Sequence, residues 1–172
     1  PPQDGAESDG ERPLSTALYY NRLAARVTAA LSVPTAEGAL YEIDTRLRPQ
    51  GAQGPLATGY EAFARYQHES AWTWEHMALA RARPIYGSPA AQEKLSDLIR
   101  EVLCDPRDPD KLKADVLNMR NEMLAAKPPK GPLDVKLMRG GLVDSEFLIH
   151  YLQLREGLGF DPAIEKAVAG LA

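Results

Sequence analysis

The sequence has little cysteine, no long apolar run and no excess of basic residues. Cys104 is the only cysteine among the 172 residues, so no disulfide can form within the chain, and we expect a reducing, cytoplasmic compartment. No apolar run approaches the roughly 20 residues that a membrane-spanning helix needs. The net charge is −4, which disfavours a general binder of nucleic acid or of an anionic membrane.

Metal-binding histidine patterns are also missing. The three histidines, His68, His76 and His150, are scattered and show no ligand spacing with Cys104. A structural zinc site needs four such ligands that converge on one ion. The sequence therefore argues against a zinc domain.

Apolar residues at three- and four-residue spacing predict helices over most of the chain. The apolar set Tyr20, Leu23, Val27, Ala30 and Leu31 has this spacing, and at least one of Trp72 and Trp74 is expected to lie in the core. The first expected helix spans residues 14 to about 31, and a second begins at Thr58, which has the capping-box spacing to Glu61, and continues or bends through residues 69–83. Further helices are expected to begin at Ser88-Pro89 and at Asp108-Pro109. The last two are expected over residues 142–156, ending at Gly157, and from Asp161-Pro162 onward.

One segment alternates as a strand does. In "ALYEIDTRLRPQGAQGPL", residues 39–56, apolar Tyr41, Ile43 and Leu47 share one face, while the other face is charged. Its loop-like exit is rich in Pro and Gly. Together with two short β-capable stretches, "ARPIYG" and "LDVKLMRGG", this segment predicts a minor β component in a helix-dominated chain. The charged face consists of Glu42, Asp44, Arg46 and Arg48.

Asp44 and Arg46 would be neighbours on such a strand, about 6.5 to 7 Å apart. A carboxylate on a rigid strand is a suitable ligand for Mg²⁺, and a guanidinium matches the oxygens of a phosphate group. The alternative is a solvated strand face on which Asp44 and Arg46 simply neutralise each other. The strand pattern alone leaves both interpretations open.

Three blocks, "YEIDTRLRPQGAQGPL", "AWTWEHMALARARPIYG" and "GGLVDSEFLIHYLQL", favour the first interpretation. In this order and with similar spacing they resemble the bifunctional glutamine synthetase adenylyltransferase/adenylyl-removing enzyme family. The resemblance extends from about Gly10 to Arg155. The second block is similar to the carboxy-terminal, adenylylating half of that family.

The resemblance implies an α+β fold, helix-dominated, with a partial polymerase-β-like nucleotidyltransferase sheet followed by a helical domain. Residues 1–86 would be the carboxy-terminal part of the nucleotidyltransferase domain, and residues 87–172 the helical domain. Such enzymes hold two Mg²⁺ ions with three carboxylates, and Asp44 matches the third. No stretch reads G-S-x-D-x-D, the motif of the other two, so we expect a fragment that is inactive alone.

The same resemblance implies transfer of AMP from ATP to a tyrosine of glutamine synthetase, which regulates nitrogen assimilation. Partners would be glutamine synthetase and the PII signalling protein, with no nucleic acid and no membrane. Asp144 and Glu146 are candidates for the domain interface. The alternative is that they only stabilise the start of their helix, where acidic residues are favoured in any protein. Asp44 would be the metal-binding and catalytic residue, and the nucleotide-binding candidates are Arg46, Arg48, Arg81, Arg83 and Lys136.

Two other functions stay open at this point. The chain alone can be a non-catalytic helical docking or regulatory module of that enzyme, which its acidic surface and missing motif favour. It can also belong to a nucleotidyltransferase that acts on another protein, such as a uridylylating enzyme. The match at "WTWEHMALARAR" argues against this last alternative.

Overall fold

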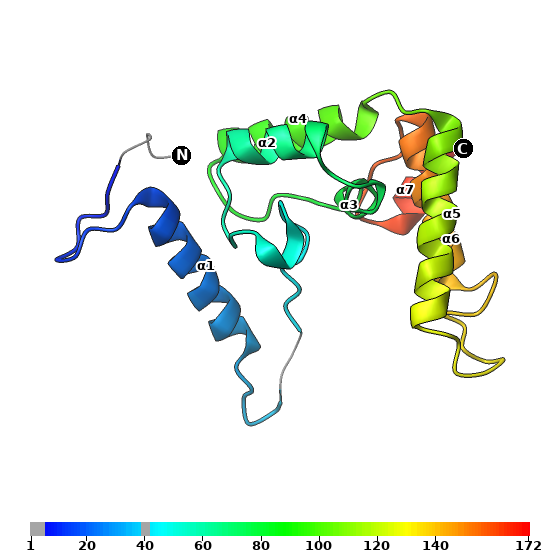
Figure 1. The fold of residues 1–172 in the computed structure, drawn as a ribbon, viewed down its shortest axis with the longest axis horizontal. Helices are drawn as coiled ribbons and strands as arrows, with labels where there is room; N and C mark the ends of the chain where they lie inside the picture. Colours follow the sequence, from blue (N-terminus) through cyan, green and yellow to red (C-terminus); the bar gives the residue numbers. More distant parts are fainter. Residues whose placement is uncertain (1–5, 39–41) are drawn as a thin grey trace. The chain divides into compact units, whose positions relative to one another are not determined.

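The computed structural model describes residues 6–38 and 42–172. Its elements follow one another as helices joined by turns (Figure 1). They are α1 (Thr16–Ser32), the 3₁₀ helix η1 (Gly51–Gln53), α2 (Tyr60–Glu69), α3 (Thr73–Leu79), α4 (Pro89–Cys104), α5 (Pro109–Ala126), α6 (Leu142–Glu156) and α7 (Ile164–Leu171).

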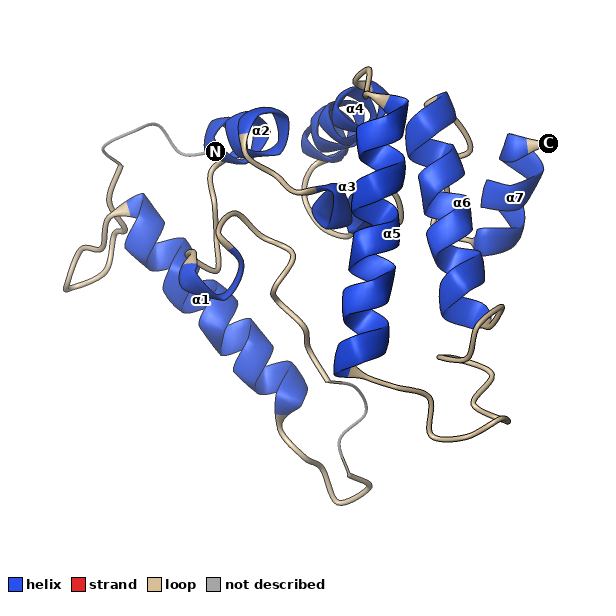
Figure 2. Cartoon of the chain, turned by 45° about the vertical axis from the view of Figure 1, so that its right-hand side comes forward, coloured by secondary structure: helices blue, strands red, loops and turns tan. Residues whose placement is uncertain are grey.

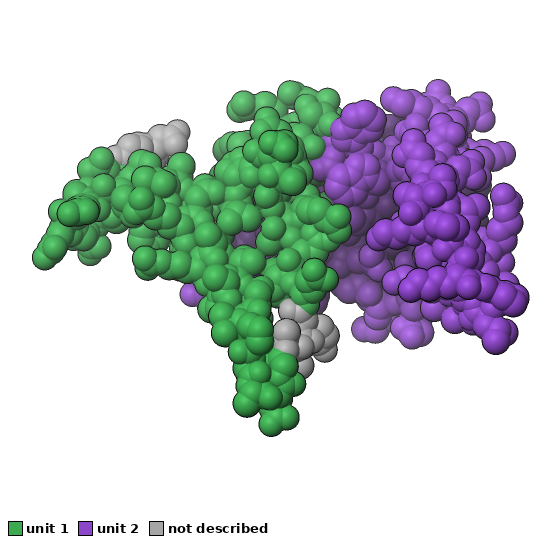
Figure 3. Space-filling view, turned by 60° about the horizontal axis from the view of Figure 1, so that its bottom comes forward, with its two compact units in different colours: residues 1–70 green, residues 71–172 purple. Residues whose placement is uncertain are grey.

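The chain divides into two compact units, residues 1–70 and residues 71–172 (Figure 3). This division does not test the domain boundary expected after residue 86, which stays a prediction. Within the described residues, no helix is both long and apolar enough to cross a membrane.

The expected sheet is wrong for the part of the chain that the structure describes. Residues 42–48, 82–87 and 133–141 contain no strand, and only two isolated bridges, Glu7 with Ser15 and Thr35 with Gly38, have β character (Figure 2). Residues 39–41 of the predicted strand lie outside the described residues. The backbone groups of a strand must pair with another strand. The side chains of Asp44 and Arg48 instead form hydrogen bonds within residues 44–54.

Residues 1–70 contain a helix whose apolar face is not covered. α1 has no buried residue, and its helically spaced apolar side chains are 43% exposed at Tyr20 and 60% exposed at Leu31. The side-chain amide of Asn21 ties α1 to residue 57: it donates to the Ala57 carbonyl at 3.3 Å and accepts the Ala57 N–H at 3.2 Å. The helix predicted from the periodicity is confirmed, and none of its residues is buried.

The capping box expected at Thr58 and Glu61 is also wrong. α2 begins one residue later than that box requires, with Gly59 at its N-cap and no side-chain cap. The Thr58 hydroxyl is buried without a hydrogen-bond partner among the described residues.

Residues 71–172 have a conventional helical core. α5 and α6 lie side by side, with α3, α4 and α7 around them (Figures 1 and 2). Local signals set their ends as predicted: the Ser88 hydroxyl accepts the Ala91 N–H, the Asp108 carboxylate caps α5, and Gly157 ends α6 with φ of 67°. The buried apolar residues of this unit are Met77, Leu79, Ala80, Leu98, Val102, Leu103, Leu112, Val116, Val143, Leu154 and Ala167.

Neither tryptophan of the second block enters this core. Trp72 is 71% exposed and Trp74 is 41% exposed, so the expectation for them is wrong. The face of α3 that is buried carries Glu75 and Met77 instead. Glu75 reaches back to accept the backbone N–H of Trp72 at 2.9 Å, which fixes the start of the helix.

Arg107 closes the carboxyl end of α4. Its guanidinium donates to three backbone carbonyls, those of Val102, Leu103 and Asp105, each at 2.8 Å. The last carbonyls of a helix have no partner within the helix, and a cation is favoured near them. Arg107 therefore stabilises both the end of α4 and the turn into α5.

Replacing Arg107 by Gln is expected to lower the free energy of unfolding by about 1–3 kcal/mol, because half-buried carbonyls lose their donors. Urea unfolding followed by circular dichroism measures this. Arg100→Gln, an exposed change on the same helix, is the control and should shift stability by less than about 0.5 kcal/mol. Equal losses in both variants would contradict the role assigned to Arg107.

Candidate functional site

Asp44 and Arg46 lie together, as predicted, although not on a strand. The Arg46 guanidinium donates hydrogen bonds to both carboxylate oxygens of Asp44, with Nε 2.9 Å from Oδ1 and Nη2 2.5 Å from Oδ2. The backbone N–H of Arg46 also donates to Oδ1 at 2.9 Å. An aspartate side chain that accepts the backbone N–H of the residue two positions later favours a turn over a strand.

This pairing changes the acidity of Asp44. The hydrogen bond from the Arg46 side chain, followed by that from the Arg46 backbone, lowers the pKa of Asp44 from 3.8 to about 2. Both side chains are mostly exposed, Arg46 at 76% and Asp44 at 54%. Because water screens an exposed pair, Arg46 can leave Asp44 without a large loss of stability.

Arg48 points its donors into its own loop. Its guanidinium donates to the carbonyl and to the hydroxyl of Thr45, the latter at 2.8 Å, and to the Gly54 carbonyl at 3.2 Å. These bonds close the loop over η1, where Gln50 has φ of 63°. The arginine thus holds the shape of residues 45–54.

The described residues do not by themselves make a Mg²⁺ site. Such a site needs several converging oxygen ligands, and no group of three or more acidic, histidine or cysteine side chains placed to hold a metal occurs in residues 6–38 and 42–172. Asp44 supplies one carboxylate, and Arg46 occupies both of its oxygens.

The candidates in residues 71–172 fall into two places. Arg81 Nη1 lies 3.6 Å from Glu146 Oε1, a partly exposed pair that joins the end of α3 to α6. Arg83 and Lys136 are exposed, and neither forms an ion pair within the described residues. The structure thus pairs Arg81 with Glu146 and leaves the other two cations facing water.

Asp144 has a clear structural role at the start of α6. It forms a hydrogen-bonded ion pair with Arg120 Nε and accepts the Gly140 N–H at 2.6 Å. The Gly140 backbone hydrogen bond and then Arg120 lower the pKa of Asp144. Gly141 allows the close approach expected of this Gly-Gly pair, because a Cβ there would lie 2.6 Å from the Val135 carbonyl oxygen.

Sequence reasoning missed Arg120. It lies on α5, 24 residues before Asp144, so no local spacing connects the two. Its Nη2 also donates to the Leu137 carbonyl at 3.0 Å, which fixes the turn before α6. Only the antiparallel packing of α5 and α6 brings these groups together.

Comparison with known proteins shows the family of this chain. A model of the family described as Glutamate-ammonia ligase adenylyltransferase matches residues 1–97. The chain belongs to the glutamate-ammonia ligase adenylyltransferase family. The resemblance inferred from the three blocks is therefore confirmed.

Similar curated proteins carry the name bifunctional glutamine synthetase adenylyltransferase/adenylyl-removing enzyme. The Brucella suis protein is 53% identical over 152 residues, which is 88% of this chain and 16% of the relative. The Agrobacterium fabrum protein is 51% identical over 148 residues, and the Mesorhizobium japonicum protein 44% identical over 159 residues. The matched part is about a sixth of each relative's length.

Asp44 is expected to remain almost wholly ionised at pH 3.8, because its folded pKa is about 2. A depressed carboxyl pKa means that the ion pair is complete above the ordinary value of 3.8 and is lost as the pH falls through about 2. A ¹³C NMR titration of the carboxyl carbon measures this. Arg46→Gln should move the midpoint up toward 3.8, whereas Arg48→Gln should not move it. An ordinary midpoint in the unchanged chain would refute the pairing.

Proposed function

We propose that this chain is part of an enzyme that transfers AMP from ATP to a tyrosine of glutamine synthetase and so regulates nitrogen assimilation. The observation that carries the proposal is the 53% identity, over 88% of this chain, to a relative named for that adenylyltransferase activity. The PII signalling protein is the regulatory partner in this proposal. A cytoplasmic location is consistent with the lone Cys104.

The reaction is an in-line displacement at the α-phosphorus of ATP. The tyrosine oxygen forms a bond to that phosphorus, the bond to the bridging oxygen of the β-phosphate breaks, and pyrophosphate leaves with the electron pair. The hydroxyl proton passes to a base or to water. Protein groups contribute chiefly by positioning the reactants and by stabilising charge.

The acidity of Asp44 favours one of its two proposed roles. A general base works best when its pKa is near the operating pH. The pKa of Asp44 is about 2 while Arg46 is bound, and the ordinary value of 3.8 is also far below neutral pH, so the carboxylate is a weak base in either case. Its lasting negative charge suits a metal ligand better. Mg²⁺ therefore enters the proposal as an ion to which Asp44 gives one carboxylate of several.

The cations take supporting roles in the proposal. Arg46 is exposed and loosely held, so it can exchange Asp44 for a phosphate oxygen. Arg48 keeps the loop in shape through Thr45 and Gly54. Arg81, Arg83 and Lys136 remain candidates for the nucleotide by virtue of charge and exposure.

A non-catalytic docking module is the second candidate function, and the uncovered apolar face of α1 favours it. Four large apolar side chains on one face of this 17-residue helix, Tyr20, Leu23, Val27 and Leu31, are each more than 40% exposed. Exposed apolar surfaces of this kind often bind a partner. If the chain is such a module, Asp44 is only a surface charge.

Labelling of glutamine synthetase with α-³²P-ATP tests the proposal in the full-length protein that carries this sequence. Asp44→Asn is expected to reduce labelling by about 100-fold or more, since it removes a charge that the transition state needs. Glu42→Gln, an exposed carboxylate two residues away, is the matched control and should keep activity within about twofold. The 172-residue chain alone is expected to label nothing.

Circular dichroism of each variant checks that the fold is intact. If Asp44→Asn labels the synthetase as well as Glu42→Gln does, Asp44 is a surface charge and the docking function gains. If the full-length protein labels another protein in preference to glutamine synthetase, the proposed substrate is wrong.

A further inference from the structure

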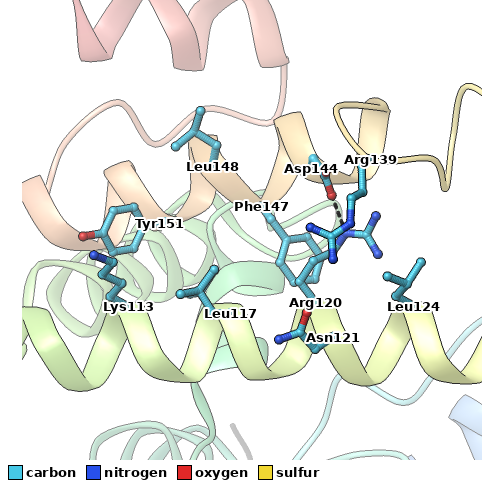
Figure 4. Close-up of a pocket in the computed structure, with 11 residues that line it drawn as sticks. Lys113, Leu117, Arg120, Asn121, Leu124, Arg139, Asp144, Phe147, Leu148 and Tyr151 are labelled. Carbon is cyan, nitrogen blue, oxygen red and sulfur yellow. Dashed lines mark hydrogen bonds and ion pairs between the residues drawn. The ribbon is translucent and has the colours of Figure 1, made fainter.

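A pocket of about 360 Å³ lies between α5 and α6 (Figure 4). Its size falls within the range of about 300–1,000 Å³ that small-molecule sites occupy. Its lining comes from residues 113–151, entirely within the second compact unit, and is mostly apolar. No residue of the segment that carries Asp44 lines this pocket.

The charges around the pocket do not balance. Three cations, Lys113, Arg120 and Arg139, line it together with a single anion, Asp144. The net charge of this lining is thus positive in a chain whose own net charge is −4. Such a local excess attracts an anion.

One of these cations is already used, and two are available. Arg120 is paired with Asp144 and is 12% exposed, so it belongs to the framework. Arg139 and Lys113 are exposed and form no ion pair within residues 42–172. Arg139 lies close enough to Asp144 for its charge to help lower the pKa of that carboxyl. In Figure 4, Arg139 lies beside the Arg120–Asp144 pair at one end of the pocket, and Lys113 lies beside Tyr151 at the other.

The space between these two ends is apolar. Leu117 of α5 and Leu148 of α6 are 54% and 57% exposed, and Phe147 lies between the cationic ends (Figure 4). Lys113 and Arg120 are seven residues apart on α5, which corresponds to about 10 Å along a helix. A ligand that fits has a compact apolar body and one acidic group.

We propose that this pocket binds a small amphipathic carboxylate, with its acidic group on the Arg139 guanidinium and its apolar body between Leu117 and Leu148. Arginine suits this role because its planar donors meet both oxygens of a carboxylate. The apolar body gains from leaving water against the two leucines. The opposite cation, Lys113, lies at the apolar end of this ligand and is not required for binding.

Octanoate is the probe, and methyl and amide NMR shifts of the 172-residue chain are the measurement. We expect shifts centred on Leu117, Leu148 and the turn that carries Arg139. Octanoate should bind about tenfold more tightly than neutral 1-octanol, because it alone gains a charge-assisted hydrogen bond. Octylammonium should bind no better than the alcohol.

Arg139→Gln should weaken octanoate about tenfold and leave 1-octanol unchanged. Arg65→Gln, an exposed arginine on α2, is the matched control and should change neither affinity. Leu148→Ser, at an exposed position, should weaken both probes, because it removes the apolar wall without adding a charge. Retained circular dichroism excludes unfolding as the cause.

Three outcomes would overturn the proposal. One is octanoate binding no tighter than 1-octanol, and another is equal binding by Arg139→Gln and the unchanged chain. The third is a dimer, detected by light scattering, that octanoate dissociates, since a second copy of the chain would then be the natural occupant of the pocket.

Discussion

Apolar packing around α3 and α6 holds residues 71–172 together, because each of these two helices contacts both α4 and α5. Val102 has no exposed surface, and Leu154 is 2% exposed. A polar group buried among them must be satisfied, and Gln153 is: it bonds to His150 at 2.8 Å and donates to the Gly159 carbonyl at 2.6 Å. The core therefore also fixes the turn after α6, and the charged residues lie on the outside of a scaffold that this packing sets.

Those parts of the fold that depend on local chemistry could be predicted from the sequence. The starts of α4 and α5 follow from Ser88 and Asp108, whose oxygens accept nearby backbone N–H groups, and the end of α6 follows from Gly157. A strand is different, because its backbone is satisfied only by another strand. Residues 42–48 alternate as a strand would, but Asp44 and Arg48 bond to their own loop instead.

In the candidate site, too, contacts between residues close in sequence could be predicted and contacts between distant residues could not. The proximity of Asp44 and Arg46 could be predicted, since two residues so close in sequence are neighbours in a strand and in a turn alike. The Arg120–Asp144 pair could not, because it depends on how α5 packs on α6. The Arg46 side chain is the main cause of the low pKa of Asp44. The turn adds the bond from the Arg46 backbone to the Asp44 carboxylate, which a strand with the same residues would lack.

α1 and α5 show that an amphipathic sequence can form a helix whether or not its apolar face is buried. Both carry apolar residues at helical spacing, and both form helices. Leu112 and Val116 of α5 are buried by neighbouring helices, whereas Leu23 and Val27 of α1 are 44% and 49% exposed. Because helices in proteins gain most of their stability from packing of an apolar face, α1 depends within this chain on helix propensity and on its link through Asn21. Periodicity thus reports which face a helix needs to cover, and only the tertiary structure shows whether this chain covers it.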